Sequence, residues 1–166
     1  MFDLSSALDG LVCDLRNVES VHTYIMENPY DGLECIEAIE QYYIKLWHYD
    51  EEFKLIRTLM YANSRFLEIA YLLERVSKAL TIMKIRAMDL HKYYQDTINL
   101  PLTVTYWGLV GRIRDIMQPL MNCYYDDIIR LLHLLEIVQK QSIRKRPRPS
   151  PTNRDCAPPT KKPRNK

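Results

Sequence analysis

The fold is decided by residues 33–100, LECIEAIEQYYIKLWHYDEEFKLIRTLMYANSRFLEIAYLLERVSKALTIMKIRAMDLHKYYQDTINL, a run of 68 residues without glycine or proline. Leucine, isoleucine, glutamate, lysine, arginine, methionine and alanine dominate this run, and most of them are good helix formers. The whole chain of 166 residues has only four glycines, and the alternating patterns that indicate strands are scarce. The sequence therefore predicts an all-α domain.

The chain combines an acidic body with a basic tail. Residues 144–166 hold nine Lys or Arg and one acid, whereas the preceding residues hold 14 bases and 20 acids. The tail contains six of the nine prolines and no Val, Ile, Leu, Met or aromatic residue. So few apolar side chains cannot offset the entropic cost of ordering the chain. We expect one helical domain over residues 1–143 and a disordered tail over 144–166.

Two features bear on the compartment. The opening MFDLSSALDG has no basic lead, and the apolar runs are far shorter than the ~20 residues that cross a bilayer. These features predict a soluble, intracellular protein without membrane insertion. The four cysteines are widely spaced and form no CxxC pair, so we expect buried free thiols rather than metal ligands or structural disulfides: Cys13, Cys35, Cys123 and Cys156.

Turn residues and apolar spacing predict the first three helical segments. A helix over about 4–26, with Gly10 as a candidate interruption, ends at the turn ENPYDG (27–32). A second helix begins at Asp31, and a long third segment begins at Asp50. The apolar sector of this third segment is too wide for a helix that covers one side of a small core. The excess predicts a hairpin, turning near 77–79 or 96–103, or a helix shared with another subunit.

Two further helices are expected after residue 103. The first, over about 105–121, contains Pro119, which we expect to kink or end it. The last begins at YYDDIIRLL, where Asp126 and Asp127 would stabilise its first turn. Its apolar side chains recur at three to four residues and predict one inner stripe.

No catalytic motif is recognisable. The sequence has no phosphate-binding GxxxxGK[ST], no GxGxxG, no GxSxG and no HExxH, and its four histidines are isolated from one another. The acid pair Glu51–Glu52 is explained by a helix start, and tyrosines on amphipathic helices usually border a core or an interface. We expect no enzymatic activity, no cofactor and no metal site.

The tail carries the strongest functional signal. Each Lys or Arg that neutralises a phosphate releases counterions and adds sequence-independent affinity. Without aromatic residues or a helical period, the tail is not expected to read bases. It also fits a nuclear import signal, and Ser150, which precedes a proline, is a candidate phosphorylation site. The predicted nucleic-acid-binding residues are Arg144, Lys145, Arg146, Arg148, Arg154, Lys161, Lys162, Arg164 and Lys166.

Three segments carry a resemblance to a known family: YIMENPYDGLECIEAIEQYYIKLWHYD (24–50), EEFKLIRTLMYANSRFLEIAYLLERV (51–76) and RIRDIMQPLMNCYYDDIIRLLHLLEIV (112–138). Their order resembles hepadnavirus core (capsid) proteins, most of all those of the non-enveloped fish relatives, the nackednaviruses. The first is similar to the family's base helix, the second to the first arm of its spike hairpin, and the third to the second arm and the helix that contacts neighbouring dimers. Val138 stands where the family has a tryptophan.

The resemblance implies a viral capsid subunit. Residues 50–96 would form a hairpin spike that pairs as a dimeric four-helix bundle, and contacts within 124–140 would join dimers into an icosahedral shell. The tail would line the interior and neutralise an RNA pregenome that is reverse-transcribed inside. The predicted dimer-interface residues are Phe53, Ile56, Met60, Leu67 and Leu73, and the predicted contacts between dimers are Ile128, Leu132, Leu135 and Val138.

The implied partners are a second copy of the chain, viral RNA or DNA, and host import receptors, in the virion, the host cytoplasm and the nucleus. The alternative is a nuclear regulatory protein with a partner-binding helical body and a tail that serves as import signal and contacts DNA. An enzyme without recognisable motifs is the third and least favoured interpretation.

Overall fold

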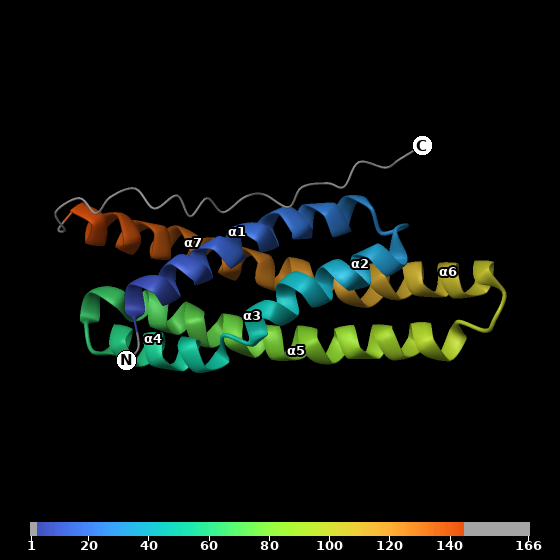
Figure 1. Cartoon of the computed structure of the whole chain (residues 1–166), viewed down its shortest axis with the longest axis horizontal. Helices are drawn as coiled ribbons and strands as arrows, with labels where there is room; N and C mark the ends of the chain where they lie inside the picture. The colour runs from blue at the N-terminus through green and yellow to red at the C-terminus, as the bar shows by residue number, and fades with distance from the viewer. Residues whose placement is uncertain (1–2, 145–166) are drawn as a thin grey trace.

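A computed structural model describes residues 3–144, with side chains for residues 3–141. Within this range the chain is helical throughout and has no strand, which confirms the all-α prediction (Figure 1). The predicted disordered tail begins at Arg144, which is instead the last residue of α7, and the rest of it falls outside the described part of the chain. In order the elements are α1 (Leu4–Glu27), α2 (Gly32–Ala38), η1 (Ile39–Ile44), α3 (Lys45–Trp47), α4 (Asp50–Tyr61), η2 (Ser64–Phe66), α5 (Leu67–Thr97), α6 (Leu102–Arg112), η3 (Ile113–Met117) and α7 (Gln118–Arg144).

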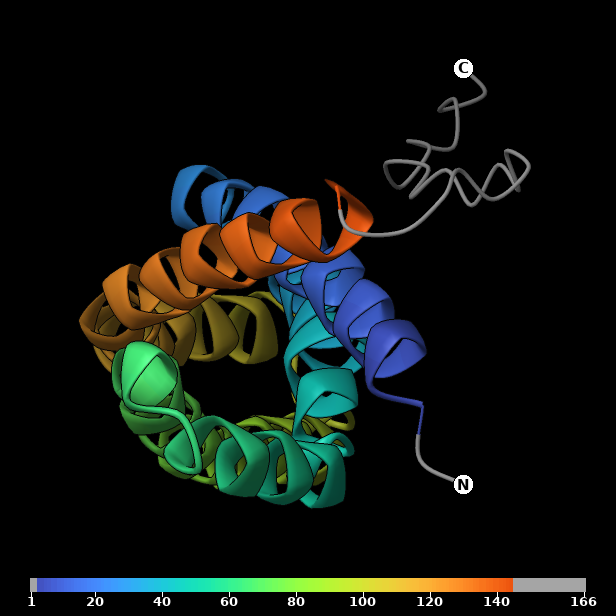
Figure 2. The ribbon, with the colours of Figure 1, turned by 90° about the vertical axis from the view of Figure 1, so that its left-hand side faces the viewer.

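The longer helices lie roughly lengthwise along the molecule (Figure 1). α1 packs along α7, α5 packs between α4 and α7, and α2, η1 and α3 connect the two layers. Viewed end-on, these helices surround a common centre (Figure 2). One apolar cluster fills it with side chains from α1, η1, α4, α5 and α7, so the described residues share a single core.

The first two predicted helices are confirmed. α1 runs through Gly10 without interruption, and its N-cap Asp3 accepts a hydrogen bond from the backbone N–H of Ser5 at 3.1 Å. Asp31 is the N-cap of α2, as expected, although its side chain instead accepts a hydrogen bond from the Tyr24 hydroxyl at 2.8 Å. Residues at three- to four-residue spacing on α1 are buried, which gives this helix its place in the core: Leu8, Leu11, Leu15, Val18 and Ile25.

The third predicted segment is not one helix, because it breaks between α4 and α5. Asn63 has extended backbone dihedrals, and its side chain accepts a hydrogen bond from the N–H of Arg65 at 3.0 Å. Asparagine competes with helical hydrogen bonding in this way. Of the two candidate positions for the hairpin turn, residues 77–79 are wrong, since they lie inside α5. The expected turn within 96–103 is confirmed, because Pro101 follows the end of α5 and caps α6.

Of the two effects predicted for Pro119, a kink or a helix end, the helix end does not occur. α6, η3 and α7 follow one another without a gap from residue 102 to residue 144, about 65 Å at 1.5 Å per residue. In the π-helical segment η3 the turn widens, and the N–H of Gln118 bonds to the carbonyl of Ile113. This wider turn accommodates the residue that lacks an N–H. Asp126 and Asp127 therefore lie inside α7 rather than in a first turn.

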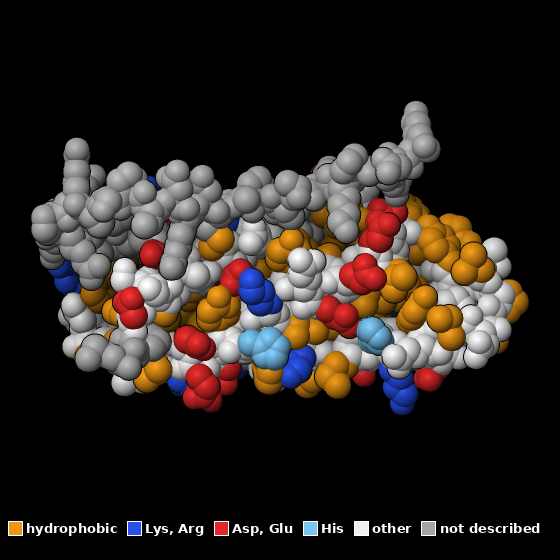
Figure 3. Space-filling view, in the orientation of Figure 1, with side chains coloured by type: hydrophobic (Ala, Val, Ile, Leu, Met, Phe, Trp, Pro, Cys, Tyr) orange, Lys and Arg blue, Asp and Glu red, His pale blue; other side chains and the backbone are white. Residues whose placement is uncertain are grey.

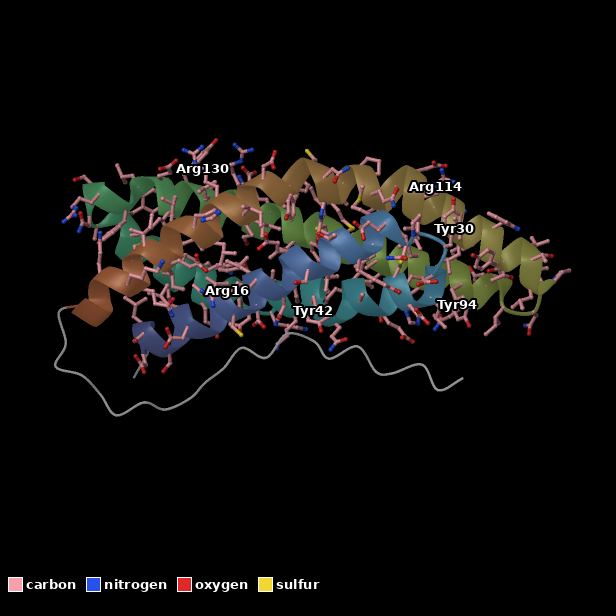
Figure 4. The ribbon with its side chains drawn as sticks, turned by 90° about the horizontal axis from the view of Figure 1, so that it is seen from above. Arg16, Tyr30, Tyr42, Tyr94, Arg114 and Arg130 are labelled. Atoms are coloured by element: carbon pink, nitrogen blue, oxygen red, sulfur yellow. The ribbon has the colours of Figure 1, made fainter. Side chains whose placement is uncertain are left out.

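Ion pairs and hydrogen bonds join helices that are distant in the sequence. Arg75 on α5 pairs with Asp127 on α7 at 2.9 Å. Arg16 on α1 pairs with Glu136 on α7 at 2.6 Å, and Arg130 pairs with Glu68 on α5. Arg16 and Arg130 lie in the half of the molecule that holds the end of α7 (Figure 4). These pairs thus link α7 to both of its neighbours, while the apolar core supplies most of the packing energy.

Candidate self-association surface

Four of the five predicted dimer-interface residues lie in the core of the single chain. Phe53, Ile56, Met60 and Leu73 are each at most 4% exposed, whereas Leu67 is 46% exposed. The apolar sector looked too wide because the turn between α4 and α5 folds the segment back on itself, so both helices contribute to one core. In this structure the four buried side chains are not accessible to a second copy.

The predicted contacts between dimers are placed similarly. Three of them, Ile128, Leu132 and Leu135, are buried in the core, and Val138 is partly buried against it. The nine basic tail residues and Ser150 lie outside the residues with described side chains; of these, only the backbone of Arg144 is described, as the last residue of α7. Apart from Leu67, any contact between copies must therefore rely on side chains that were not predicted for it.

The outer face of α5 exposes several of these side chains. Its buried residues, such as Ile69, Val76, Leu80 and Met83, define the inner side of the helix. On the opposite side, large apolar side chains form two groups, residues 67–71 and 82–88, and the ion pair between Lys78 and Glu74 lies between them on the same face. α5 lies at the periphery of the bundle (Figure 2), so this face meets solvent. Its exposed apolar residues are Leu67 at 46%, Tyr71 at 55%, Ile82 at 38%, Ile85 at 53% and Met88 at 60%.

A second apolar surface lies at the end of the molecule where α5 turns into α6. Figure 3 shows hydrophobic side chains gathered at this end. Tyr30 and Leu33, exposed at 50% and 42%, flank Gly32, which approaches Leu109 of α6 so closely that a Cβ would come within 2.8 Å of its side chain. The remaining exposed apolar residues here are Ile98, Leu100, Leu102, Val104, Tyr106 and Trp107.

Acidic residues dominate the face formed by the end of α1, α2 and η1. Residues 17–44 contain six acids and no Lys or Arg, and acidic side chains form a row over α2 (Figure 3). Two of them, Asp31 and Glu34, accept hydrogen bonds from the Tyr24 hydroxyl at 2.8 and 3.0 Å. Burial and these carboxylates raise the pKa of Tyr24. This face repels phosphates rather than binding them.

His22 forms a polar cluster inside the α1–α7 interface. Its ring stacks on Tyr125 at 3.9 Å between centroids, and its Nε2 lies 3.0 Å from the side-chain oxygen of Asn122. Burial lowers the pKa of His22 below the ordinary 6.5, although Asn122 and the nearby Asp126 oppose the shift. His22 is therefore neutral in the folded protein near pH 7, and the geometry holds two helices together rather than presenting a catalytic group.

We expect stability to fall as the pH falls through the range in which His22 titrates. The unfolded chain takes up this proton near pH 6.5, whereas the folded chain resists protonation. The stabilisation that His22 contributes to folding is therefore complete above pH 6.5 and is lost as the pH falls toward its lowered pKa in the folded state. It amounts to about 1.4 kcal/mol for each unit between the pKa values of the unfolded and folded states. His22→Phe keeps the ring stacking and should flatten the Tm profile between pH 7.5 and 5, measured by circular dichroism. The exposed control His133→Gln should retain the wild-type slope; an unchanged slope in His22→Phe contradicts the assignment.

The described cysteines differ from one another. Cys35 is buried and free, and burial together with nearby carboxylates raises its pKa to about 12. Cys123 is free but exposed, so the expectation of burial fails there. Cys13 takes part in a disulfide bond, contrary to the expected free thiol. Among residues 3–141, no group of three or more His, Cys, Asp or Glu side chains is placed to hold a metal ion.

No helix within residues 3–144 combines the length and the apolar character needed to cross a membrane. Comparison with protein-family models, with curated proteins and with solved structures finds no match to this chain.

Proposed function

We propose that this protein is a viral capsid subunit that assembles from homodimers into a closed icosahedral shell and packages an RNA pregenome. Dimers form side by side through the outer face of α5 and make a helical bundle across the contact. The tail, residues 144–166, neutralises nucleic-acid phosphates inside the shell. Closed symmetric assembly multiplies individually weak contacts, so each interface needs only modest affinity.

The exposed apolar face of α5 carries this proposal. Single exposed apolar residues are normal on protein surfaces and need no explanation. Here five large ones lie on one face of a 31-residue helix, as a pair at residues 67–71 and a group of three at residues 82–88, with the Lys78–Glu74 ion pair between them. Extended apolar stripes on helices are the usual basis of helix pairing between subunits. The same segment was predicted from the sequence to pair with a second copy, but of the residues predicted for that contact only Leu67 lies on this face.

The tail begins at one end of the long axis of the molecule, so packaging can take place at that end while the rest of the body is used for assembly. The turn between α5 and α6 lies at one end of the long axis, and α7 finishes at the other (Figure 1). Because α6, η3 and α7 are continuous, about 65 Å separates Leu102 from Arg144. Side-by-side copies with parallel long axes would therefore bring all their tails to the same side, as packaging inside a shell requires.

Charge restricts nucleic-acid binding to the tail. The body preceding Arg144 has six more acids than bases, and the tail has eight more bases than acids. A phosphate chain is therefore repelled by the body and attracted by the tail. If many tails share one compartment, their charges add, so a modest number of bases per chain suffices to hold a long RNA.

The proposal is tested with the double variant Ile85→Glu/Met88→Glu. Both side chains are more than half exposed, so the fold should keep its wild-type Tm. Two unpaired acids in an apolar contact should lower the fraction of protein in particles at least tenfold, as each costs on the order of 1.4 kcal/mol or more. Analytical ultracentrifugation measures that fraction.

Leu59→Glu is the matched control, because Leu59 is 48% exposed and lies on α4, outside the α5 face. It should assemble like the wild type. Undiminished particles from the α5 variant would refute this interface. A wild-type chain that forms only a small oligomer would favour the alternative, a nuclear regulatory protein.

A further inference from the structure

The end of the molecule opposite the tail carries an apolar surface that the proposed dimer does not use. We define the hairpin-end patch as Ile98, Leu100, Leu102, Val104, Tyr106 and Trp107, which lie in the α5–α6 turn and the first turns of α6. Their exposed fractions range from 38% for Tyr106 to 84% for Leu102. Six large apolar side chains within ten residues are therefore left in water at one end of the molecule.

The turn that presents this patch is held by hydrogen bonds. The N–H of Leu100 donates to the carbonyl of Thr97, and the hydroxyl of Thr105 donates to the same carbonyl. Tyr106 and Trp107 contact each other edge to face at 5.3 Å between ring centroids. A surface already fixed in shape loses little conformational entropy when it binds, and exposed Trp and Tyr are frequent binding hot spots.

The size of the patch fits a protein–protein contact. If each side chain has a full area of roughly 150–250 Å², the exposed area of the six side chains together is on the order of 600 Å². This area is about three quarters of the ~800 Å² that each partner contributes to a standard interface, and it equals the upper end of the ~300–600 Å² of the largest apolar patch on a typical monomer.

The charge pattern identifies the partner. The body as a whole is acidic, so two copies repel each other over most of their surfaces. Residues 97–111, however, contain no charged side chain. Two copies can therefore meet at this end without burying a charge or opposing like charges. An uncharged apolar surface is also complementary to itself under two-fold symmetry.

We propose that the hairpin-end patch binds the same patch of a neighbouring copy whose long axis is roughly parallel, so that it joins α5-paired dimers into larger assemblies while all tails stay on one side. This inference rests on the proposed self-assembly and supplies the contact between dimers. The residues predicted for that role, Ile128, Leu132 and Leu135, are buried in the core and cannot fill it. Aromatic and aliphatic side chains at the end of the hairpin take their place.

The test compares full-length variants by sedimentation velocity over a concentration series. Leu102→Glu/Trp107→Glu changes two highly exposed residues, at 84% and 60%, so the fold should be retained, as circular dichroism will verify. This end variant should stop at dimers, whereas the control Leu59→Glu should form wild-type particles. Combining the end variant with Ile85→Glu/Met88→Glu removes both contacts and should give monomers.

The outcomes separate this inference from the proposed function. Wild-type particles from the end variant, or a combined variant no more dissociated than the α5 variant alone, would overturn the end contact and leave the capsid proposal intact. A monomeric wild-type chain would refute the capsid proposal itself. If the wild type floats with phosphatidylcholine vesicles and the end variant does not, the patch binds lipid and the inference is overturned.

Discussion

Replacing the nine basic residues of 144–166 by glutamine is expected to abolish RNA binding at physiological salt. For single strands, the logarithm of affinity falls by about 0.7 per neutralised phosphate for each tenfold rise in salt. Nine contacts give a slope of about 6, so the wild-type affinity should fall by about three to four orders of magnitude between 50 and 200 mM salt. The neutralised variant should show almost no slope, because the remaining body is acidic. Fluorescence anisotropy with a single-stranded RNA measures both.

The control for this prediction changes charge on the body instead. Lys78, Lys92 and Lys140 are exposed, and the pair between Lys78 and Glu74 is a surface i,i+4 contact of little energy. Changing these three lysines to glutamine should leave both the affinity and the salt slope within error of the wild type. An equal loss in this variant would show that the body, rather than the tail, binds RNA.

Leu73→Ala is expected to lower the free energy of unfolding by about 2–5 kcal/mol, the usual cost of truncating a fully buried leucine. Leu73 has 0% exposure and lies in the core. Total stabilities are only about 5–15 kcal/mol, so this one change removes a large share. The loss should be the same at two protein concentrations that differ tenfold, because it arises within one chain. Urea unfolding followed by circular dichroism measures it.

Leu59→Ala is the matched control, because Leu59 lies on α4 outside the α5 face. Leu59 is 48% exposed, so its truncation should cost well under 1 kcal/mol. A Leu73→Ala variant that keeps wild-type stability but loses only its association would place Leu73 in a contact between copies. That result would contradict its position in the core.

The sequence predicted the helical class and several boundaries because those signals are local. The N-cap at Asp31, the end of α1 and the turn before Pro101 all follow from residues that are neighbours in the chain. The break at Asn63 was missed, although Asn-Ser was the available signal, because the surrounding residues are good helix formers. The helix end predicted at Pro119 does not occur because a π-helical turn before the proline accommodates it. That turn depends on packing, which the identity of residue 119 does not reveal.

The predicted interfaces were less successful for a physical reason. Apolar periodicity identifies the side of a helix that is buried, but a core and a subunit contact bury the same kinds of residue. Ile56 and Leu135 therefore resembled interface residues although they lie in the core. The candidate surfaces, at Ile85 and Leu102, became visible only once the remaining apolar residues could be sorted by exposure. The charge division between body and tail required only the sequence.

The most direct measurement of the central claim is the size and content of the full-length protein purified from cells that express it. We predict closed particles, visible by electron microscopy and sedimenting far ahead of a dimer, that hold RNA protected from added nuclease. The neutralised-tail variant should form shells of the same kind without RNA. A stable monomer or an isolated dimer at high protein concentration and high salt would contradict the proposal.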